Sequence, residues 1–165
     1  IMISSILDIG RTEGAQFEQP KNIDLVEFIK YKTNDYNMLA SKKSITIKFS
    51  SNVSSFQIII QETLFNQILQ NFVQNAIKFT PNGKTIKIKL KKIDDKVILN
   101  VIDEGIGIDE NIDVFAPFKK VGKENGVGLG LYLAKIASDA LNAKISIKNR
   151  EDGKTGAIAK LELTL

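Results

Sequence analysis

One stretch of the sequence places amide and ammonium side chains at regular helical spacing. Gln67, Asn71 and Asn75 are four residues apart and Lys78 follows three residues later, so on a helix they form one stripe. The stripe holds no carboxylate to neutralise the ammonium group, and it suits a ligand that carries negatively charged oxygens. An Asn carbonyl can supply one of the few protein oxygens that Mg²⁺ takes beside water and phosphate. Taken alone, an ordinary polar helix face explains the stripe at least as well.

A second group of residues follows an apolar, strand-like run. Asp103 ends the run, and Gly105 and Gly107 permit positive φ and let a planar ring approach the main chain. A carboxylate in this place accepts a hydrogen bond from the exocyclic amine of adenine, whereas guanine presents a carbonyl oxygen there. The plainer alternative is a tight turn capped by its own aspartate.

A third group combines glycines and lysines at the start of an expected helix. Gly126, Gly128 and Gly130 leave main-chain N–H groups bare where the helix dipole favours a phosphate. The lysines just before them are Lys119, Lys120 and Lys123. The alternative for this segment is a flexible, solvated loop.

Two common nucleotide motifs are excluded. Gly83-Lys84-Thr85 and Gly153-Lys154-Thr155 resemble the end of a P-loop, but the earlier glycine of that motif is replaced by Lys78 and Lys148. The dinucleotide pattern G-x-G-x-x-G fails because its third glycine would have to stand at Leu131.

The composition excludes further chemistry. Among 165 residues there is no cysteine, hence no disulfide, thiolate nucleophile or Cys-based metal site, and no histidine, hence no phosphohistidine within this chain. The net charge of +4 is mild and the lysines are distributed along strands, so we expect a solvated basic surface and no nucleic-acid partner. No apolar run reaches the ~18 residues of a membrane span and no signal peptide is apparent, so we expect no membrane contact from this chain. Because the chain begins at Ile1 inside an apolar periodic stretch, we interpret it as part of a longer protein.

The periodicity of apolar residues predicts the elements that position these groups. Helices are expected over 3–17, 22–40, 61–79 and 128–141, the second capped by Asn22 or Asp24 and the third ended by Thr80-Pro81. Alternating residues predict strands over 44–49, 56–60, 85–90, 97–103, 143–148 and 157–165. Strands punctuated by packed helices indicate an α+β fold, a two-layer sandwich whose mixed sheet is covered on one face by about three helices.

The order of the three groups resembles the GHKL nucleotide-binding superfamily. The residues within each group are most similar to those of sensor histidine kinases. The fold implied is the Bergerat-type ATP-binding fold. Residues 6–18 are similar to the exit of the dimerisation helix of these kinases. The segments that resemble the family's N, G1, F and G2 boxes are NFVQNAIKFTPNG (71–83), DEGIGI (103–108), FAPF (115–118) and GVGLGLYLAK (126–135).

The resemblance implies a role for each of these residues. Asn75 would bind Mg²⁺, with Asn71 beside it on the metal or the phosphates. Lys78 would contact a phosphate, Phe79 would lie against adenine, and Asp103 would read the adenine amino group.

Further implied contacts come from loops. Gly105 and Gly107 would shape the base pocket, and Lys120 stands where the family often has a phosphate-binding Arg, although a lysine lacks that residue's bidentate fork. Val127 stands where a Thr is common. The glycines that would hinge a short lid over ATP are Gly126, Gly128 and Gly130.

The resemblance also implies an activity and partners. The reaction would be transfer of the ATP γ-phosphoryl group to a histidine upstream of this chain. Residues 1–17 would be the tail of the dimerisation and phospho-acceptor helix, and residues 18–165 the catalytic ATP-binding domain. The expected partners are ATP and ADP, the phospho-acceptor domain of a homodimeric parent, and a response regulator or receiver domain. The expected place is the cytoplasm, whether or not the parent is anchored in a membrane.

Two alternatives stay open at this point. GHKL ATPases place a glutamate base four residues before the metal-binding Asn, and here that position is Asn71, which cannot take up a proton as a carboxylate does. A degenerate interaction module that keeps the fold without kinase activity is the other alternative, favoured by Lys120, Val127 and the short lid.

Overall fold

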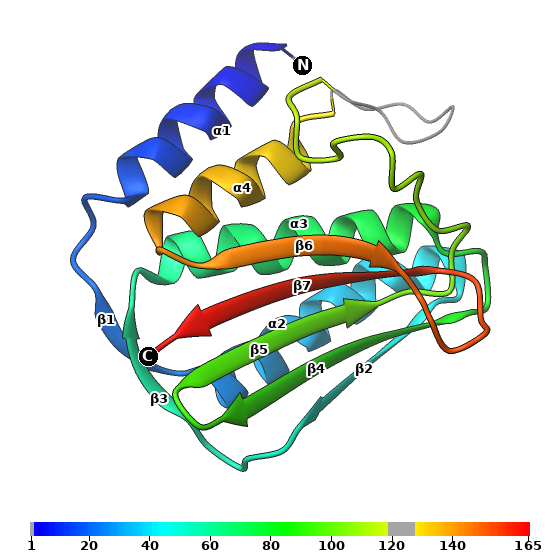
Figure 1. Cartoon of the computed structure of the whole chain (residues 1–165), viewed down its shortest axis with the longest axis horizontal. Coiled ribbons are helices and arrows are strands. Elements are labelled where there is room, and N and C mark those ends of the chain that lie inside the picture. Colours follow the sequence, from blue (N-terminus) through cyan, green and yellow to red (C-terminus); the bar gives the residue numbers. More distant parts are fainter. Residues whose placement is uncertain (1, 119–127) are drawn as a thin grey trace.

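The computed structural model describes residues 2–118 and 128–165 and has the two layers expected from the sequence, with helices on one face of a mixed sheet (Figure 1). The main sheet has the strand order β2-β4-β5-β7-β6, in which β2 runs parallel to β4 and the other neighbours are antiparallel. In chain order the elements are α1 (Met2–Ala15), β1 (Lys21–Asp24), α2 (Leu25–Ala40), the 3₁₀ helix η1 (Ser41–Lys43), β2 (Thr46–Ser51), β3 (Gln57–Ile60), α3 (Glu62–Phe79), β4 (Thr85–Ile93), β5 (Lys96–Ile102), α4 (Gly130–Ala140), β6 (Lys144–Asn149) and β7 (Ala157–Thr164).

The core lies between the sheet and the helices α2, α3 and α4. Helix α3 contributes its fully buried face, and the strands contribute every second residue, as the two side-chain periods require. Helix α1 lies over α4 and α3, with Ala15 buried in the same core (Figure 1). The side chains of Ile6 and Leu7 on α1 are exposed. No helix in the described ranges is long and apolar enough to cross a membrane.

One strand was not predicted from the sequence. β1 pairs with β3 in a small antiparallel sheet beside the main one. Its four residues have no apolar alternation, so only the distant partner strand makes them extended. Asp24 then begins α2 as its N-cap, accepting hydrogen bonds from the amides of Val26 (2.9 Å) and Glu27 (3.2 Å). Of the two cap residues considered, the structure selects Asp24.

The lysines that the sequence distributes over several strands gather on the open face of the sheet. Ile86, Ile88 and Leu90 of β4 point into the core, so the lysines between them point to the opposite side. Pairing in register adds the lysines of neighbouring strands to this face, which we call the lysine face. Its charged residues on the strands are Lys48, Lys87, Lys89, Lys91, Lys96, Lys144, Lys148, Lys160 and the single carboxylate Glu162.

Candidate functional site

Asp103 stands directly after β5 with a side chain that is only 9% exposed. Its Oδ1 accepts hydrogen bonds from the amides of Gly105 (2.8 Å) and Ala157 (3.0 Å). Within the described part of the chain, no donor reaches the second oxygen, Oδ2. Burial raises the pKa of this carboxyl, and the two amides and the charge of Arg150 oppose that shift. The structure thus fixes one oxygen and leaves the other open to a ligand.

A small cavity joins Asp103 to helix α3. Asn75 and Phe79 come from the last two turns of α3, and the opposite wall comes from β5, β6 and β7. The lining is largely apolar, with Asp103 as its carboxylate. The lining residues are Phe72, Asn75, Ala76, Phe79, Val101, Asp103, Ile108, Leu131, Ile147, Ala157 and Ala159.

The volume of this cavity is about 40 Å³. Such a void holds roughly one water molecule. A planar ring therefore fits beside Asp103 only after the surrounding side chains move apart, and binding has to include that adjustment.

The two glycines after Asp103 are required by close contacts. A Cβ on Gly105 would lie 2.6 Å from the carbonyl oxygen of Phe79, so the loop can pass the end of α3 only with a glycine. Gly107 has φ of 80° and packs against the side chain of Asn149. Both residues were predicted to shape the pocket, and in the structure they form the loop beside it.

Asn149, at the end of β6, was not singled out in the sequence. Its Oδ1 accepts a hydrogen bond from the amide of Ile108 (2.7 Å), and its Nδ2 donates to the carbonyl oxygen of the same residue (2.9 Å). The carboxamide therefore pairs with Ile108 as a neighbouring strand would and holds a wall of the cavity. Because the partners are 41 residues apart in the sequence, no local sequence pattern predicts the contact.

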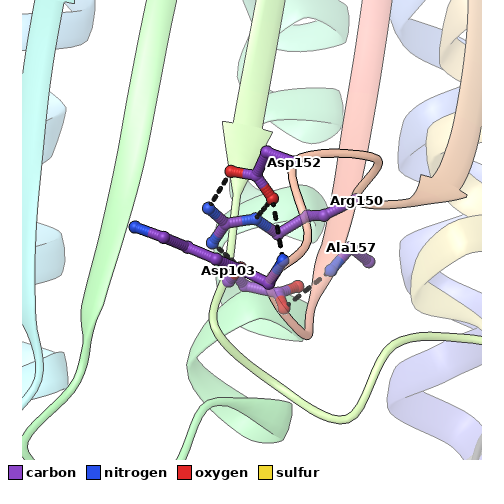
Figure 2. Close-up of polar contacts among 5 residues, drawn as sticks. Asp103, Arg150, Asp152 and Ala157 are labelled. Carbon is purple, nitrogen blue, oxygen red and sulfur yellow. Dashed lines mark hydrogen bonds and ion pairs between the residues drawn. The ribbon is translucent and has the colours of Figure 1, made fainter.

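Arg150 is the second residue that sequence reasoning missed. Its Nη1 donates to the main-chain carbonyl of Asp103 (3.0 Å), and its Nε and Nη2 form a fork with the carboxylate of Asp152. Figure 2 shows the guanidinium between Asp152 and the chain at Asp103, with the Ala157 amide on the other side of Asp103. The only signal in the sequence was the position of an arginine in the turn before Gly153 and Gly156.

The residues of the polar stripe on α3 lie in different surroundings: Asn71 is buried, and Asn75 lines the cavity. Asn71 is 6% exposed, and its Nδ2 donates to the carbonyl oxygen of Gln67 (2.8 Å). Its Oδ1 faces Gly130, where an added Cβ would lie 2.9 Å away, so α4 begins against this amide. Asn75 lines the cavity, and its carboxamide has no hydrogen-bond partner in the described ranges. The Lys78 ammonium lies 5.3 Å from the centre of the Phe79 ring.

The glycine-rich segment is only partly within the described residues. Gly128 has φ of 72°, and its carbonyl oxygen accepts a hydrogen bond from the amide of Phe118 (3.0 Å). Gly130 is the first residue of α4. The other two predicted contacts, Lys120 and Gly126, lie outside the described residues.

Comparison with known proteins shows the family to which the chain is similar. Residues 60–165 match the family described as histidine kinase-, DNA gyrase B- and HSP90-like ATPases. The chain is 31% identical to the sensor protein KdpD of Clostridium acetobutylicum over 98% of its own length and 18% of that protein. It is 26% identical to the sensor protein kinase PilS of Pseudomonas aeruginosa over 93% of its length and 29% of PilS. The chain thus spans less than a third of either relative.

Solved structures give the same result. The catalytic domain of histidine kinase ThkA is 29% identical, with a TM-score of 0.79 over 89% of this chain and 96% of that domain. Full-length ShkA, solved in complex with AMPPNP, superposes with a TM-score of 0.84 at 24% identity, over 98% of this chain and 34% of ShkA. The chain belongs to the family of histidine kinase-, DNA gyrase B- and HSP90-like ATPases, and its homologues and structural neighbours identify it as an ATP-binding catalytic domain of the sensor histidine kinase type.

Proposed function

We propose that this chain binds Mg-ATP in the cavity beside Asp103 and transfers the γ-phosphoryl group to a histidine that lies outside it. The observation that carries the proposal is the difference between the two carboxylate oxygens of Asp103. Oδ1 is held by two main-chain amides, no donor in the described ranges reaches Oδ2, and the residue lines a largely apolar cavity. An amino group on a purine is a donor that such an acceptor recognises.

The residues beside the cavity fit a magnesium ion held mainly by phosphates. Among the described residues the carboxamide of Asn75 has no hydrogen-bond partner, and the Oδ1 of Asn71, which faces Gly130, accepts no hydrogen bond. Amide oxygens are ligands that Mg²⁺ accepts in small number. No group of three acidic residues suited to a metal occurs in the described ranges, so phosphate oxygens and water would complete the shell. When bound, the ion neutralises charge on the β- and γ-phosphates.

The remaining phosphate contacts come from α3 and the start of α4. Lys78 supplies a positive charge one turn from Asn75, and the main-chain amides of Gly128 and Gly130 at the N-terminus of α4 have no acceptor among the described residues. Lys120 and Gly126 are proposed as further contacts from the sequence alone.

The reaction forms a bond between a histidine nitrogen and the γ-phosphorus and breaks the bond to the leaving oxygen of ADP. This chain has no histidine, so the acceptor comes from another segment or chain. The chain contributes positioning and charge neutralisation. Hydrolysis is not favoured, because Asn71 occupies the position of the glutamate base of GHKL ATPases, and a carboxamide cannot take up a proton from water as a carboxylate does.

We propose two kinds of partner. ThkA, 28% identical with a TM-score of 0.74 over 88% of this chain and 41% of that protein, has been solved in complex with the response regulator TrrA. We propose a response regulator or receiver domain as the partner here too. We also propose that residues 1–17 are the tail of a dimerisation and phospho-acceptor helix, because the exposed Ile6 and Leu7 of α1 fit a helix that packs against a further segment.

Calorimetry with Mg-ATP tests the base contact. In Asp103→Asn the amide oxygen takes the place of Oδ1, which accepts hydrogen bonds from two main-chain amides. The amide nitrogen then takes the place of Oδ2, and its N–H groups repel the amino group of the purine. We expect affinity to fall at least about tenfold, the effect of losing a hydrogen bond to a charged group. Asp35→Asn, an exposed change on α2, is the matched control and should bind as the wild type does. Absence of binding by the wild type would favour a degenerate interaction module.

Labelling with ATP that carries radioactive γ-phosphate tests the direction of transfer. We expect no acid-labile phosphate on this chain alone, and only slow release of inorganic phosphate. Rapid steady-state release would contradict the kinase proposal and support a hydrolysing ATPase.

A further inference from the structure

Arg150 lies in the turn between β6 and β7 and is one of two arginines in the chain. Its side chain is 7% exposed, which is unusual for a guanidinium. Its main-chain amide donates to the carbonyl oxygen of Gly156 (3.0 Å), while its Nη1 reaches the carbonyl oxygen of Asp103 (3.0 Å). Arg150 therefore contacts the end of β5, through Asp103, and the start of β7, through Gly156.

Asp152 fixes the orientation of this guanidinium. Oδ1 of Asp152 accepts from Nε (3.0 Å) and Oδ2 accepts from Nη2 (2.5 Å), a bidentate arrangement (Figure 2). The hydrogen bond from Arg150 lowers the pKa of Asp152 to about 2, so the carboxylate is charged at neutral pH. Because the guanidinium is bound by Asp152 and the main chain of Arg150 by Gly156, the side chain has little freedom to turn away from Asp103.

Gly156 completes the contact between the turn and Asp103. It has φ of 126°, and a Cβ at this position would overlap the carbonyl oxygen of Asp103 and touch the Arg150 side chain. The glycine lets the turn approach closely enough for the guanidinium to reach that carbonyl. Arg150 is not among the residues that line the cavity, so it acts through Asp103.

The charge of Arg150 counteracts the burial of Asp103. Burial disfavours the ionised carboxylate, and among side chains in the described ranges Arg150 is the cation that opposes it. The residues that helix α3 contributes to the cavity are uncharged, and the Lys78 ammonium lies 5.3 Å from the centre of the Phe79 ring. The other charged groups coupled to Asp103, Arg150 or the adjoining Glu104 are Lys84, Asp152 and Lys154.

We propose, on the basis of the function proposed above, that Arg150 is a positioning residue for purine selection, which holds the chain at Asp103 and keeps its side chain a charged acceptor. An ionised Oδ2 accepts a hydrogen bond from the 6-amino group of adenine. A protonated Oδ2 instead donates, and it then suits a purine with a 6-oxo group. Arg150 thereby sets the pH range in which the site prefers an aminopurine.

The test compares the affinities for Mg-ATP and Mg-ITP over a series from about pH 5 to about pH 8.5. ITP carries a carbonyl oxygen at the position of the amino group. The variants are Arg150→Met, which removes the charge and keeps the stem, Arg150→Lys, which keeps the charge without the fork, and Asp152→Asn, which loosens the fork. Arg11→Met, at the other arginine on exposed α1, is the matched control. Circular dichroism and thermal melting establish that each variant is folded.

Removing the Arg150 charge raises the pKa of Asp103, so ATP affinity in Arg150→Met begins to fall at a higher pH than in the wild type. At the acid end of the series, the preference for ATP over ITP is lower than in the wild type, by up to about tenfold for each unit of that rise. Near pH 8.5 the preference returns towards the wild-type value. Arg150→Lys should keep the wild-type pH profile, and Asp152→Asn should lie between wild type and Arg150→Met.

Equal losses for ATP and ITP at every pH in Arg150→Met would overturn the inference, because a purely structural role predicts that result. If Arg150→Met does not fold, the same decision rests on Asp152→Asn, whose unchanged profile would likewise overturn it. Failure of the wild type to bind ATP would instead contradict the proposed function, so the two failures are distinguishable.

Discussion

At Thr80 the chain leaves α3 with a side chain that is fully buried, and no hydrogen-bond partner for its Oγ1 lies in the described part of the chain. The neighbouring buried polar residues each have a partner for at least one atom: Oδ1 of Asp103 accepts from two amides, and Nδ2 of Asn71 donates to the carbonyl oxygen of Gln67. A buried hydroxyl without a partner loses its hydrogen bonds to water and gains none in return. Thr80 is therefore a residue where the fold keeps an unfavourable group next to the candidate site.

Thr80→Val should raise the free energy of unfolding by about 1 kcal/mol, because it replaces the unpaired hydroxyl with a methyl group of similar shape. Urea unfolding measures the change. Thr33→Val is the control, since the Thr33 hydroxyl is also buried but donates to the carbonyl oxygen of Ile29 (2.7 Å). Stability should not rise in that variant. A loss of stability in Thr80→Val would mean that the hydroxyl has a partner in solution.

At the scale of elements, Asp24 connects three segments. Its Oδ1 accepts from the amides of Val26 and Glu27 at the start of α2 and from the amide of Phe56 (3.3 Å) before β3. Its Oδ2 accepts from Gln57 (3.3 Å) and from the hydroxyl of Ser55. One carboxylate thus caps the helix and holds the small sheet of β1 and β3 against it.

Asp24→Ala should cost about 2 kcal/mol, the upper end of the range for an N-cap, because it also removes the contacts to β3. The hydrogen bond from Ser55 is the main cause that lowers the pKa of Asp24 below its usual 3.8. A lowered folded-state pKa stabilises the protein above the unfolded pKa, and this stabilisation is lost as the pH falls through the folded value. The difference between wild type and variant should therefore be full at neutral pH and shrink below about pH 4.

Urea unfolding at several pH values checks this expectation. Asp35→Ala, in the middle of α2 and exposed, is the control and should change stability little. A cost for Asp24→Ala that stays constant through acid pH would contradict the proposed role of its charge.

At the scale of the whole molecule, the open side of the sheet concentrates positive charge. Lys48 on the edge strand β2 stands directly opposite Lys87 of β4, whereas Lys144 on the other edge strand, β6, stands opposite Glu162 of β7. Glu162 also pairs with Lys96 (2.8 Å) and Lys160 (3.1 Å). Like charges directly across a sheet destabilise it and opposite charges stabilise it.

Lys48→Glu should therefore stabilise the protein by about 0.5 kcal/mol, and Lys144→Glu should destabilise it by a similar amount. Both changes lower the net charge from +4 to +2, so the overall charge is matched between them. The effects should shrink at high salt, which screens exposed charges. Changes of the same sign in both variants, measured by urea unfolding in low salt, would contradict an effect of local pairing.

The sequence by itself determined the elements and most of the polar residues at the site. Apolar periods of 3.6 and 2 fixed α3, α4 and the strands of the main sheet, because each element buries one face. Asn75 and Asp103 were also identified from residue type and spacing, and Phe79 from the resemblance to the kinase family; all three line one cavity. The roles assigned to them, and to Lys120 and Gly126, stay predictions.

Only the tertiary structure decided what surrounds those residues. Arg150 and Asp103 are 47 residues apart, and Asn149 and Ile108 are 41 apart, yet each pair is in hydrogen-bond contact. The extended form of β1, the lysine face and the burial of Asn71 likewise depend on which strands and helices become neighbours. Local patterns record how a segment buries its own face, whereas strand order and loop closure bring distant segments together, and those depend on the energy of the whole packed chain.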